Sequence, residues 1–194
     1  ERDKEENIPL PLVPGALPRA NQGWVTGDDG RHYYIDDNGV GHSGEDAMFA
    51  SNRDKNWKPT MTQKEADEWA KDSNIKNTLY HGTRSENVDG IKKDGLNPEK
   101  GIHKSGTYMT SNREYAIEYG DGEKSTFDVK INVNKVKETT YDEMMKDGYR
   151  GFNEKTKKEG YDAFIYNRPR RTEFKGKDTD VIVVLNKKAM TIVK

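Results

Sequence analysis

Apolar and polar residues alternate along the second half of the chain, and this alternation predicts short strands. In residues 125–133, STFDVKINV, apolar side chains stand at every second position, as in a strand with one buried face. Two short runs around Gly-Asp-Asp-Gly, at 24–26 and 32–35, predict a hairpin. Further strands are predicted at 78–82, 106–110, 161–166, 180–185 and 189–193.

Helix signals separate these strands. Thr62 stands three residues before Glu65, and Ser111 stands three residues before Glu114, which is the spacing of a capping box. The predicted helices cover about 62–72, 85–95 with Gly95 at the end, 112–119, and 141–160 with interruptions at Gly148 and Gly151. Strands and helices in this order indicate an α+β domain.

The first part of the chain has a different character. Prolines at positions 9, 11, 14 and 18 exclude a helix and favour extended geometry, so residues 1–22 are predicted to be a proline-rich linker. Residues 23–76 are predicted to form an accessory hairpin plus helix, and residues 77–194 the principal domain. Because a run of charges leads directly into the linker, we expect the sequence to belong to a larger polypeptide.

Composition narrows the function classes. Hydrophobic residues make up 31% and charged residues 35% of the 194 residues, so the predicted core is small. Lysine plus arginine, 33 residues, nearly balances aspartate plus glutamate, 34 residues, which gives no overall attraction to nucleic acid or an anionic membrane. The lack of cysteine excludes disulfides, cysteine nucleophiles and thiolate metal ligands. No apolar run reaches the about 18–20 residues of a membrane span. His32, His42 and His103 lack the spacing of metal ligands, so we expect no metal. Because no apolar run is long enough to span a bilayer, we also expect no membrane partner.

Three polar side chains stand at the ends of predicted strands. His81 ends the first strand of the principal domain, Tyr108 lies in the second, and Asp180 opens the strand DVIVVL. Strand ends present polar groups into a cleft while the middle of the sheet stays apolar, so these residues form a candidate site. Each also has a structural interpretation, as a satisfied histidine, a core tyrosine and an aspartate that caps a turn.

An order of motifs that resembles a known family runs through residues 77–194. The motifs are LYHGT, IKKDGL, GTYMTSNREYAIEYG, GYDAFIY and DVIVVLNKKAMTIV. Together they resemble the ADP-ribosyltransferase fold of the diphtheria toxin and poly(ADP-ribose) polymerase class, which is named for a His, Tyr, Glu triad. Bacterial and phage-encoded toxin domains of this class look more similar still. The resemblance implies an ADP-ribosyltransferase catalytic domain with a split antiparallel β-sheet core flanked by short helices.

The resemblance also implies roles for individual residues. His81 would hydrogen-bond the 2′-hydroxyl of the adenosine ribose of NAD, and Gly82 would hold the nicotinamide carboxamide through its backbone. Tyr108 would line one face of the nicotinamide ring and Tyr119 would stack on the other, since aromatic faces attract a cationic ring. Thr83 completes the predicted NAD-binding set.

A carboxylate is expected to stabilise the ribose cation that forms as the glycosidic bond breaks. Asp180 stands where the family usually has glutamate, which shortens the side chain by a methylene group. Glu173, in the loop NRPRRTEFKGKD, is the alternative catalytic acid. A second departure is Ala116, where the polymerase branch commonly has a serine.

The resemblance implies an NAD-dependent mono-ADP-ribosyltransferase that releases nicotinamide and modifies a macromolecular acceptor, either protein or nucleic acid. An immunity protein or a phage structural protein is an expected partner. We expect an effector that is secreted, injected or carried by a virion and acts in the cytoplasm of a target cell. Alternatives are an NAD glycohydrolase, an RNA 2′-phosphotransferase-like enzyme and an inactive NAD-pocket interaction domain.

Acceptor choice is expected to depend on two loops, at 97–105 and 167–179, because binding specificity is concentrated in loops. Their glycine, lysine and arginine content is compatible with any of the acceptors named above. Arg168, Arg170 and Arg171 are interpreted as part of a solvated loop rather than as a binding patch.

Overall fold

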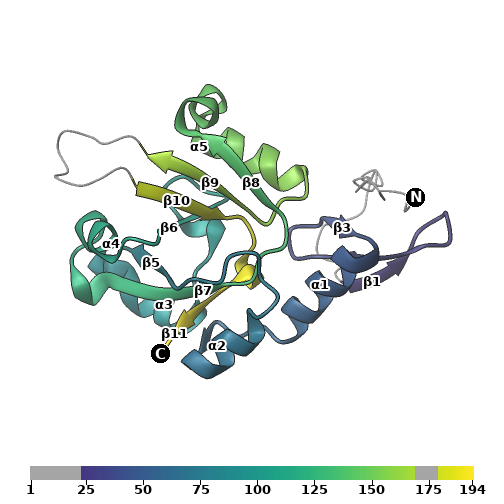
Figure 1. The fold of residues 1–194 in the computed structure, drawn as a ribbon, viewed down its shortest axis with the longest axis horizontal. Helices are drawn as coiled ribbons and strands as arrows, with labels where there is room; N and C mark the ends of the chain where they lie inside the picture. Colours follow the sequence, from purple (N-terminus) through teal and green to yellow (C-terminus); the bar gives the residue numbers. More distant parts are fainter. Residues whose placement is uncertain (1–22, 169–178) are drawn as a thin grey trace.

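The computed structural model describes residues 23–168 and 179–194, which form two sheets with helices packed against them (Figure 1). In these residues the smaller sheet has the strand order β1-β2-β3 and the larger has the order β4-β11-β7-β5-β6-β10-β9-β8. The strands are β1 Gly23–Thr26, β2 His32–Ile35, β3 Gly41–His42, β4 Thr60–Met61, β5 Leu79–Gly82, β6 Thr107–Thr110, β7 Thr126–Ile131, β8 Val136–Thr140, β9 Ala163–Arg168, β10 Thr179–Val184 and β11 Met190–Val193. The α-helices are α1 Gly44–Lys55, α2 Gln63–Trp69, α3 Val88–Asp94, α4 Arg113–Tyr119 and α5 Tyr141–Lys158.

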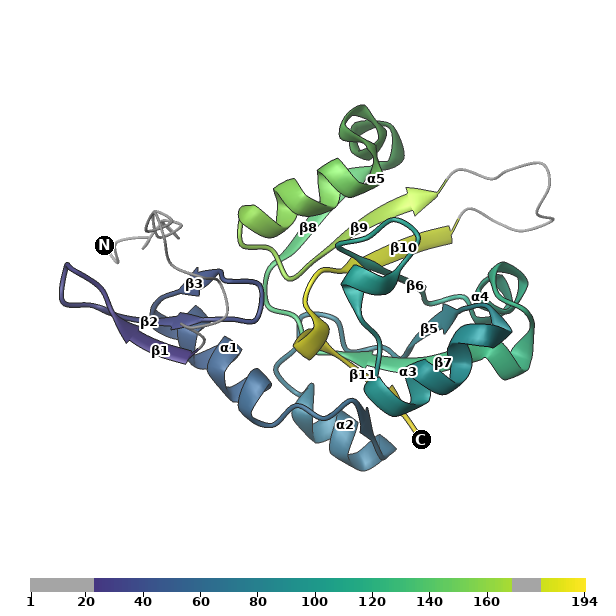
Figure 2. The same cartoon turned by 180° about the vertical axis from the view of Figure 1, so that it is seen from behind.

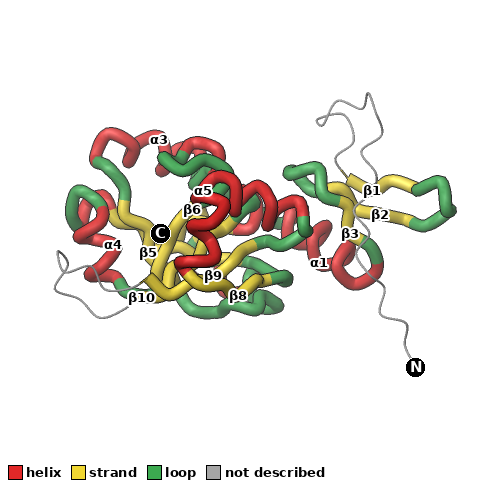
Figure 3. The backbone as a smooth tube through the Cα atoms, turned by 90° about the horizontal axis from the view of Figure 1, so that it is seen from above, coloured by secondary structure: helices red, strands yellow, loops and turns green. Residues whose placement is uncertain are grey.

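The small sheet contains the predicted hairpin. β1 and β2 pair antiparallel, with Trp24 opposite Tyr34 and the Gly-Asp-Asp-Gly turn between them. The Tyr34 hydroxyl donates to Oδ2 of Asp54 in α1 over 3.0 Å, which fixes the helix against the sheet. Figure 3 shows the small sheet at one end of the molecule, with α1 on the side nearer the large sheet.

The large sheet is split between β5 and β6. Its neighbouring strands are antiparallel except for β4–β11 and β8–β9, which are parallel. β5 pairs with β7 over four residues, but β5 and β6 are joined at a single pair, Tyr80 opposite Thr110. The sheet therefore consists of two half-sheets, β4-β11-β7-β5 and β6-β10-β9-β8, and the predicted α+β fold with a split sheet is confirmed.

Two hydrophobic clusters form the core of the large sheet. Met144 and Phe152 of α5 pack with Phe164 and Val183 of the half-sheet that contains β9 and β10, which α5 covers (Figure 2). A second cluster packs against α3 and joins both half-sheets, with Val129 of β7 on one side of the seam and Met109 of β6 and Ile182 of β10 on the other. α5 bends at Gly148, whose φ of +70° is not helical, so the predicted interruption is present there.

Residues before position 77 contribute directly to the large sheet. β4 pairs with β11, the C-terminal strand of the chain. The indole Nε1 of Trp57 donates to the Met190 carbonyl over 2.9 Å. Nη1 of Arg53 lies 3.1 Å from Oδ1 of Asp162, and both side chains are buried. The division of the chain at residues 22 and 76 stays a prediction.

Two helix starts illustrate local sequence signals. Thr62 caps α2 with a capping box to Glu65, as predicted. α4 ends at Tyr119 as predicted, but its N-cap is Asn112, whose side chain accepts the Tyr115 N–H over 3.1 Å, and not Ser111. An asparagine side chain caps a helix as well as a serine does, so the spacing alone did not distinguish the two.

Candidate active site

The imidazole of His81 lies at the seam between the two half-sheets. Its Nδ1 is 2.7 Å from the carbonyl oxygen of Tyr108. If the ladder continued beyond the pair of Tyr80 and Thr110, Gly82 would stand opposite Tyr108. The His81 side chain therefore bonds a carbonyl where backbone pairing has stopped, and it joins two of the residues predicted for the triad.

This contact determines the tautomer of His81. A carbonyl oxygen can only accept a hydrogen bond, so Nδ1 carries the proton and Nε2 presents a lone pair. Burial lowers the pKa of His81 below its ordinary value of 6.5, and the bond to the Tyr108 carbonyl partly opposes this. The neutral ring can accept a hydrogen bond at Nε2, which is what a ribose hydroxyl requires.

Gly82 allows α4 to lie directly on β5. A Cβ atom at Gly82 would be 1.9 Å from the carbonyl oxygen of Ala116, far inside any permitted contact. Gly120 faces the same strand, and a Cβ there would be 2.8 Å from the backbone nitrogen of Thr83. The N–H of Asp121 then donates to the Thr83 carbonyl over 3.0 Å. Glycine is required at position 82 by the helix contact.

The peptide group of Gly82 is directed toward the seam. The N–H of Thr83 donates to the Ser125 carbonyl on the β7 side over 2.9 Å. Neighbouring residues of an extended strand direct their N–H groups to opposite sides, so the N–H of Gly82 is directed toward β6. This is the direction from which a ligand in the seam would meet it.

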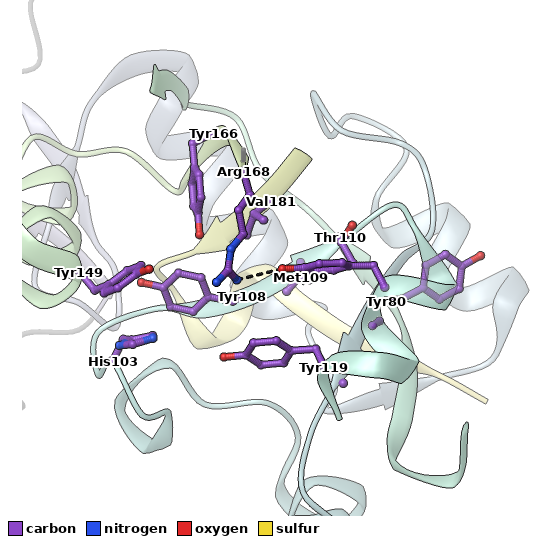
Figure 4. Close-up of a pocket in the computed structure, with 13 residues that line it drawn as sticks. Tyr80, His103, Tyr108, Met109, Thr110, Tyr119, Tyr149, Tyr166, Arg168 and Val181 are labelled. Atoms are coloured by element: carbon purple, nitrogen blue, oxygen red, sulfur yellow. Dashed lines mark hydrogen bonds between the residues drawn. The ribbon is translucent and has the colours of Figure 1, made fainter. Parts of the chain in front are cut away.

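A pocket lined mainly by aromatic side chains opens beside the seam (Figure 4). It holds about 530 Å³ of space, including the part open to solvent. Three residues of the predicted NAD-binding set line it, namely Gly82, Tyr108 and Tyr119, whereas His81 and Thr83 are not among the lining residues. Other lining residues are Tyr80, His103, Tyr115, Tyr149, Tyr166 and Arg168.

One wall of the pocket is held by α5. The His103 ring stacks on Tyr149 with 4.0 Å between ring centroids, and it meets the Tyr108 ring edge-on at 5.4 Å. Nδ2 of Asn153, a fully buried residue of α5, lies 3.0 Å from the Tyr108 hydroxyl and 3.2 Å from the Lys104 carbonyl. Lys104 has a φ of +39°, which is unfavourable for a residue other than glycine. Asn153 therefore fixes both the tyrosine and the strained loop that carries His103.

Tyr108 and Tyr119 have different environments. Burial raises the pKa of the Tyr108 phenol, although the hydrogen bond with Asn153 lowers it in part, so the hydroxyl stays neutral. The Tyr119 side chain is 51% exposed and stands at the rim. Ala116, one helical turn before Tyr119, is buried and lines the same pocket. One ring is thus held rigidly and the other is accessible, which suits a pair that encloses a planar ligand.

Of the two candidate catalytic acids, Asp180 and Glu173, the structure describes only Asp180. Val181 of β10 lines the pocket, and because side chains alternate along a strand, Asp180 is on the other face of the sheet. Asp180 is exposed, and its Oδ1 accepts a hydrogen bond from Asn167 over 3.0 Å. Among the described residues, no hydrogen bond or ion pair joins Asp180 to His81 or Tyr108. Glu173 lies outside the described residues, and the catalytic roles of both acids stay predictions.

Arg168 is a pocket residue that the sequence analysis placed in a solvated loop. It is half-buried, and its Nη1 donates to the Tyr115 hydroxyl over 2.9 Å. The alternation of Phe164, Tyr166 and Arg168 along β9 was the signal that would have placed it on the pocket face. His103 and Asn153 gave no comparable signal, because a loop and a helix bring them there. Arg170 and Arg171 lie outside the described residues.

Within 23–168 and 179–194 no group of three or more His, Cys, Asp or Glu side chains is placed to hold a metal ion. In the same part of the chain, no helix combines the length and the apolar character needed to cross a bilayer.

Comparison with known proteins gives one family. Residues 40–192 match the family model described as the poly(ADP-ribose) polymerase catalytic domain. No curated protein matches the chain. The match includes α1, β4 and α2 as well as the split sheet, and it covers every residue that lines the pocket.

Proposed function

Because the chain belongs to the poly(ADP-ribose) polymerase catalytic-domain family, whose members are NAD-dependent ADP-ribosyltransferases, we propose that it transfers a single ADP-ribose unit to a macromolecular acceptor. The observation that carries this proposal is the convergence of Gly82, Tyr108 and Tyr119 on one pocket. His81 is joined to the pocket residue Tyr108 by the bond from Nδ1 to the Tyr108 carbonyl, which leaves Nε2 as an acceptor.

The residues present fit NAD. The pocket has aromatic walls for the nicotinamide ring, and the Gly82 peptide faces the seam where a carboxamide would bond. His81 accepts from a ribose hydroxyl and so orients the substrate. NAD supplies the glycosidic bond that is broken and nicotinamide as the leaving group.

Positive charge develops on the ribose as nicotinamide leaves, so a carboxylate nearby lowers the barrier. Asp180 is our first candidate because it adjoins Val181, which lines the pocket. A side chain on the opposite face of β10 must reach around the strand end to act, and Asn167 restrains it. Glu173 is the second candidate.

We also propose that the chain is a toxin or effector of a bacterium or phage, delivered to the cytoplasm of a target cell and held in check by an immunity protein. The support is the resemblance of its motifs to bacterial and phage toxin domains. Growth inhibition on expression, relieved by the variant that abolishes NAD cleavage, is the expected result. Undiminished toxicity of that variant would contradict the effector proposal.

The enzymatic proposal is tested by nicotinamide release from NAD, with and without bacterial lysate. We expect release that needs lysate and is lost in His81→Ala. Of Asp180→Asn and Glu173→Gln, the variant of the true catalytic acid loses release, while Asp128→Asn, an exposed aspartate of β7, keeps it. Mass spectrometry of the acceptor distinguishes one ADP-ribose from a polymer.

Other outcomes identify the alternatives. Equal release without lysate would favour an NAD glycohydrolase, with water as the acceptor. Removal of a 2′-phosphate from RNA, without nicotinamide release from NAD alone, would favour the phosphotransferase. Absence of both NAD cleavage and NAD binding would refute the enzymatic proposal.

A further inference from the structure

Arg168 brings a positive charge into the aromatic pocket. Arg168 and Tyr166 are two residues apart on β9, so both side chains are on the pocket face, and Figure 4 shows the guanidinium pointing into the pocket. The hydrogen bond from Nη1 to the Tyr115 hydroxyl, 2.9 Å long, holds the guanidinium there. A guanidinium has five N–H donors, and this bond uses one of them.

Among the described residues, the pocket offers this cation no carboxylate. The described residues that line the pocket include neither aspartate nor glutamate. Asp180 is on the other face of β10, where it accepts from Asn167. Burial raises the pKa of both Tyr108 and Tyr166, so these phenols stay neutral and supply no negative charge. Within the described pocket the charge of Arg168 is therefore not matched by an anion of the protein.

The charge of Arg168 also acts on its neighbours. Burial lowers the pKa of His103, and the nearby guanidinium lowers it further. The His103 ring is thus kept neutral, and the pocket contains one permanent cation among neutral aromatic groups. A ligand with a negative group gains from this arrangement, whereas free nicotinamide, a neutral ring, gains no attraction between charges.

NAD has a cationic nicotinamide ring and an anionic diphosphate. Resting on the proposed function, we propose that Arg168 binds the diphosphate of NAD and makes the pocket select the intact dinucleotide over its nicotinamide fragment. Guanidinium donors match phosphate oxygens in pairs, which an ammonium group does not reproduce. Tyr115 is the positioning residue that holds the guanidinium ready for this contact.

Two probes separate the halves of NAD, and calorimetry measures their affinities. ADP-ribose carries the diphosphate without nicotinamide, and nicotinamide carries no phosphate. Arg168→Gln is expected to weaken ADP-ribose binding about 10- to 100-fold, as the loss of charge-assisted hydrogen bonds does. The ADP-ribose affinity of Arg168→Lys should lie between those of the native chain and Arg168→Gln. The affinity of these variants for nicotinamide should not weaken. Arg84→Gln, at an exposed arginine outside the pocket, serves as the matched control.

Salt dependence provides the second readout. ADP-ribose binding to the native chain should weaken as salt rises, and this dependence should be reduced in Arg168→Gln. Thermal unfolding checks that each variant is folded. Tighter or unchanged ADP-ribose binding in a folded Arg168→Gln would overturn the inference while leaving the proposed function intact. Failure of the native chain to bind both NAD and ADP-ribose would overturn the two together.

Discussion

At the residue scale, a single hydrogen bond determines what His81 offers to a ligand. The Tyr108 carbonyl accepts the hydrogen bond from the protonated Nδ1, so Nε2 carries no proton and can accept a hydrogen bond. Protonation at Nε2 would convert that acceptor into a donor and remove its use for a ribose hydroxyl. Because burial lowers the pKa of His81, this loss requires a pH below the ordinary histidine value.

We therefore expect NAD affinity to be constant above pH 6.5, the ordinary pKa of histidine, and to fall only below it. Replacing His81 by Gln should weaken NAD binding about tenfold, the value of one hydrogen bond, and should remove the pH dependence. Calorimetric titration across the pH range measures both effects. A midpoint above 6.5 would contradict a buried neutral ring.

The same substitution at His32, an exposed histidine of β2, is the matched control and should change neither affinity nor pH profile. His103 needs a separate check, because burial lowers its pKa as well. If His103→Gln removes the pH dependence and His81→Gln preserves it, the titrating group is His103 in the wall of the pocket and not His81 at the seam.

At the element scale, the position of α4 depends on how closely its backbone approaches β5. Gly82 and Gly120 both lie at this contact, and a Cβ atom on either residue would collide with the backbone opposite it. α4 carries Tyr115, Ala116 and Tyr119, so its distance from the strand determines where one side of the pocket stands.

Gly82→Ala is expected to destabilise the fold by about 1–3 kcal/mol, the usual cost of an added group in a filled contact. The Cβ would meet a backbone carbonyl, which cannot move without the helix. Gly90→Ala in α3 is the control, since a Cβ there meets nothing within 4 Å, and it should stabilise by about 0.5–1 kcal/mol. Urea unfolding measures both, and equal stability of the two variants would contradict the close contact.

Elements with strong apolar patterns could be predicted from the sequence, and polar ones could not. β7 alternates cleanly, and the hairpin of β1 and β2 has its turn residues. α1 was missed because it buries Arg53 and Asp54, whose burial depends on partners distant in the sequence. β8, VKETT, is a polar strand at the sheet edge, so it lacks an apolar face.

The residues of the candidate site divide in the same way, into those that the sequence could predict and those that it could not. His81, Gly82, Tyr108 and Tyr119 belong to local motifs and could be named from the sequence. Asn153 could not, because its contacts with Tyr108 and the Lys104 carbonyl join residues more than forty positions apart.

At the scale of the whole molecule, a buried charge network connects the small sheet and α1 to the large sheet. Arg53 donates to Asp54 over 2.9 Å and to Asp162 over 3.1 Å. Burial raises the pKa of Asp54, and the charge of Arg53 opposes that rise. Removing the cation would leave two buried carboxylates without their counter-charge.

Arg53→Met should therefore lower the free energy of unfolding by about 3–5 kcal/mol, as expected for a broken buried ion pair. The deficit should shrink as the pH falls, because the pKa of Asp54 is raised and its protonated carboxyl group needs no counter-charge. Arg84→Met, in an exposed pair with Glu86, is the control and should cost less than about 1 kcal/mol. Urea unfolding at neutral and acidic pH compares them, and a mild effect at Arg53 would show that the connection contributes little.

The seam between β5 and β6 has a mechanical consequence. One ladder pair and one imidazole cross it, whereas every other neighbouring pair of strands in the large sheet shares at least two ladder pairs. Backbone pairing is therefore weakest along this line, and side chains supply most of the connection there. A ligand held by His81 from one half-sheet and Tyr108 from the other would add a further connection and stiffen the sheet along this line.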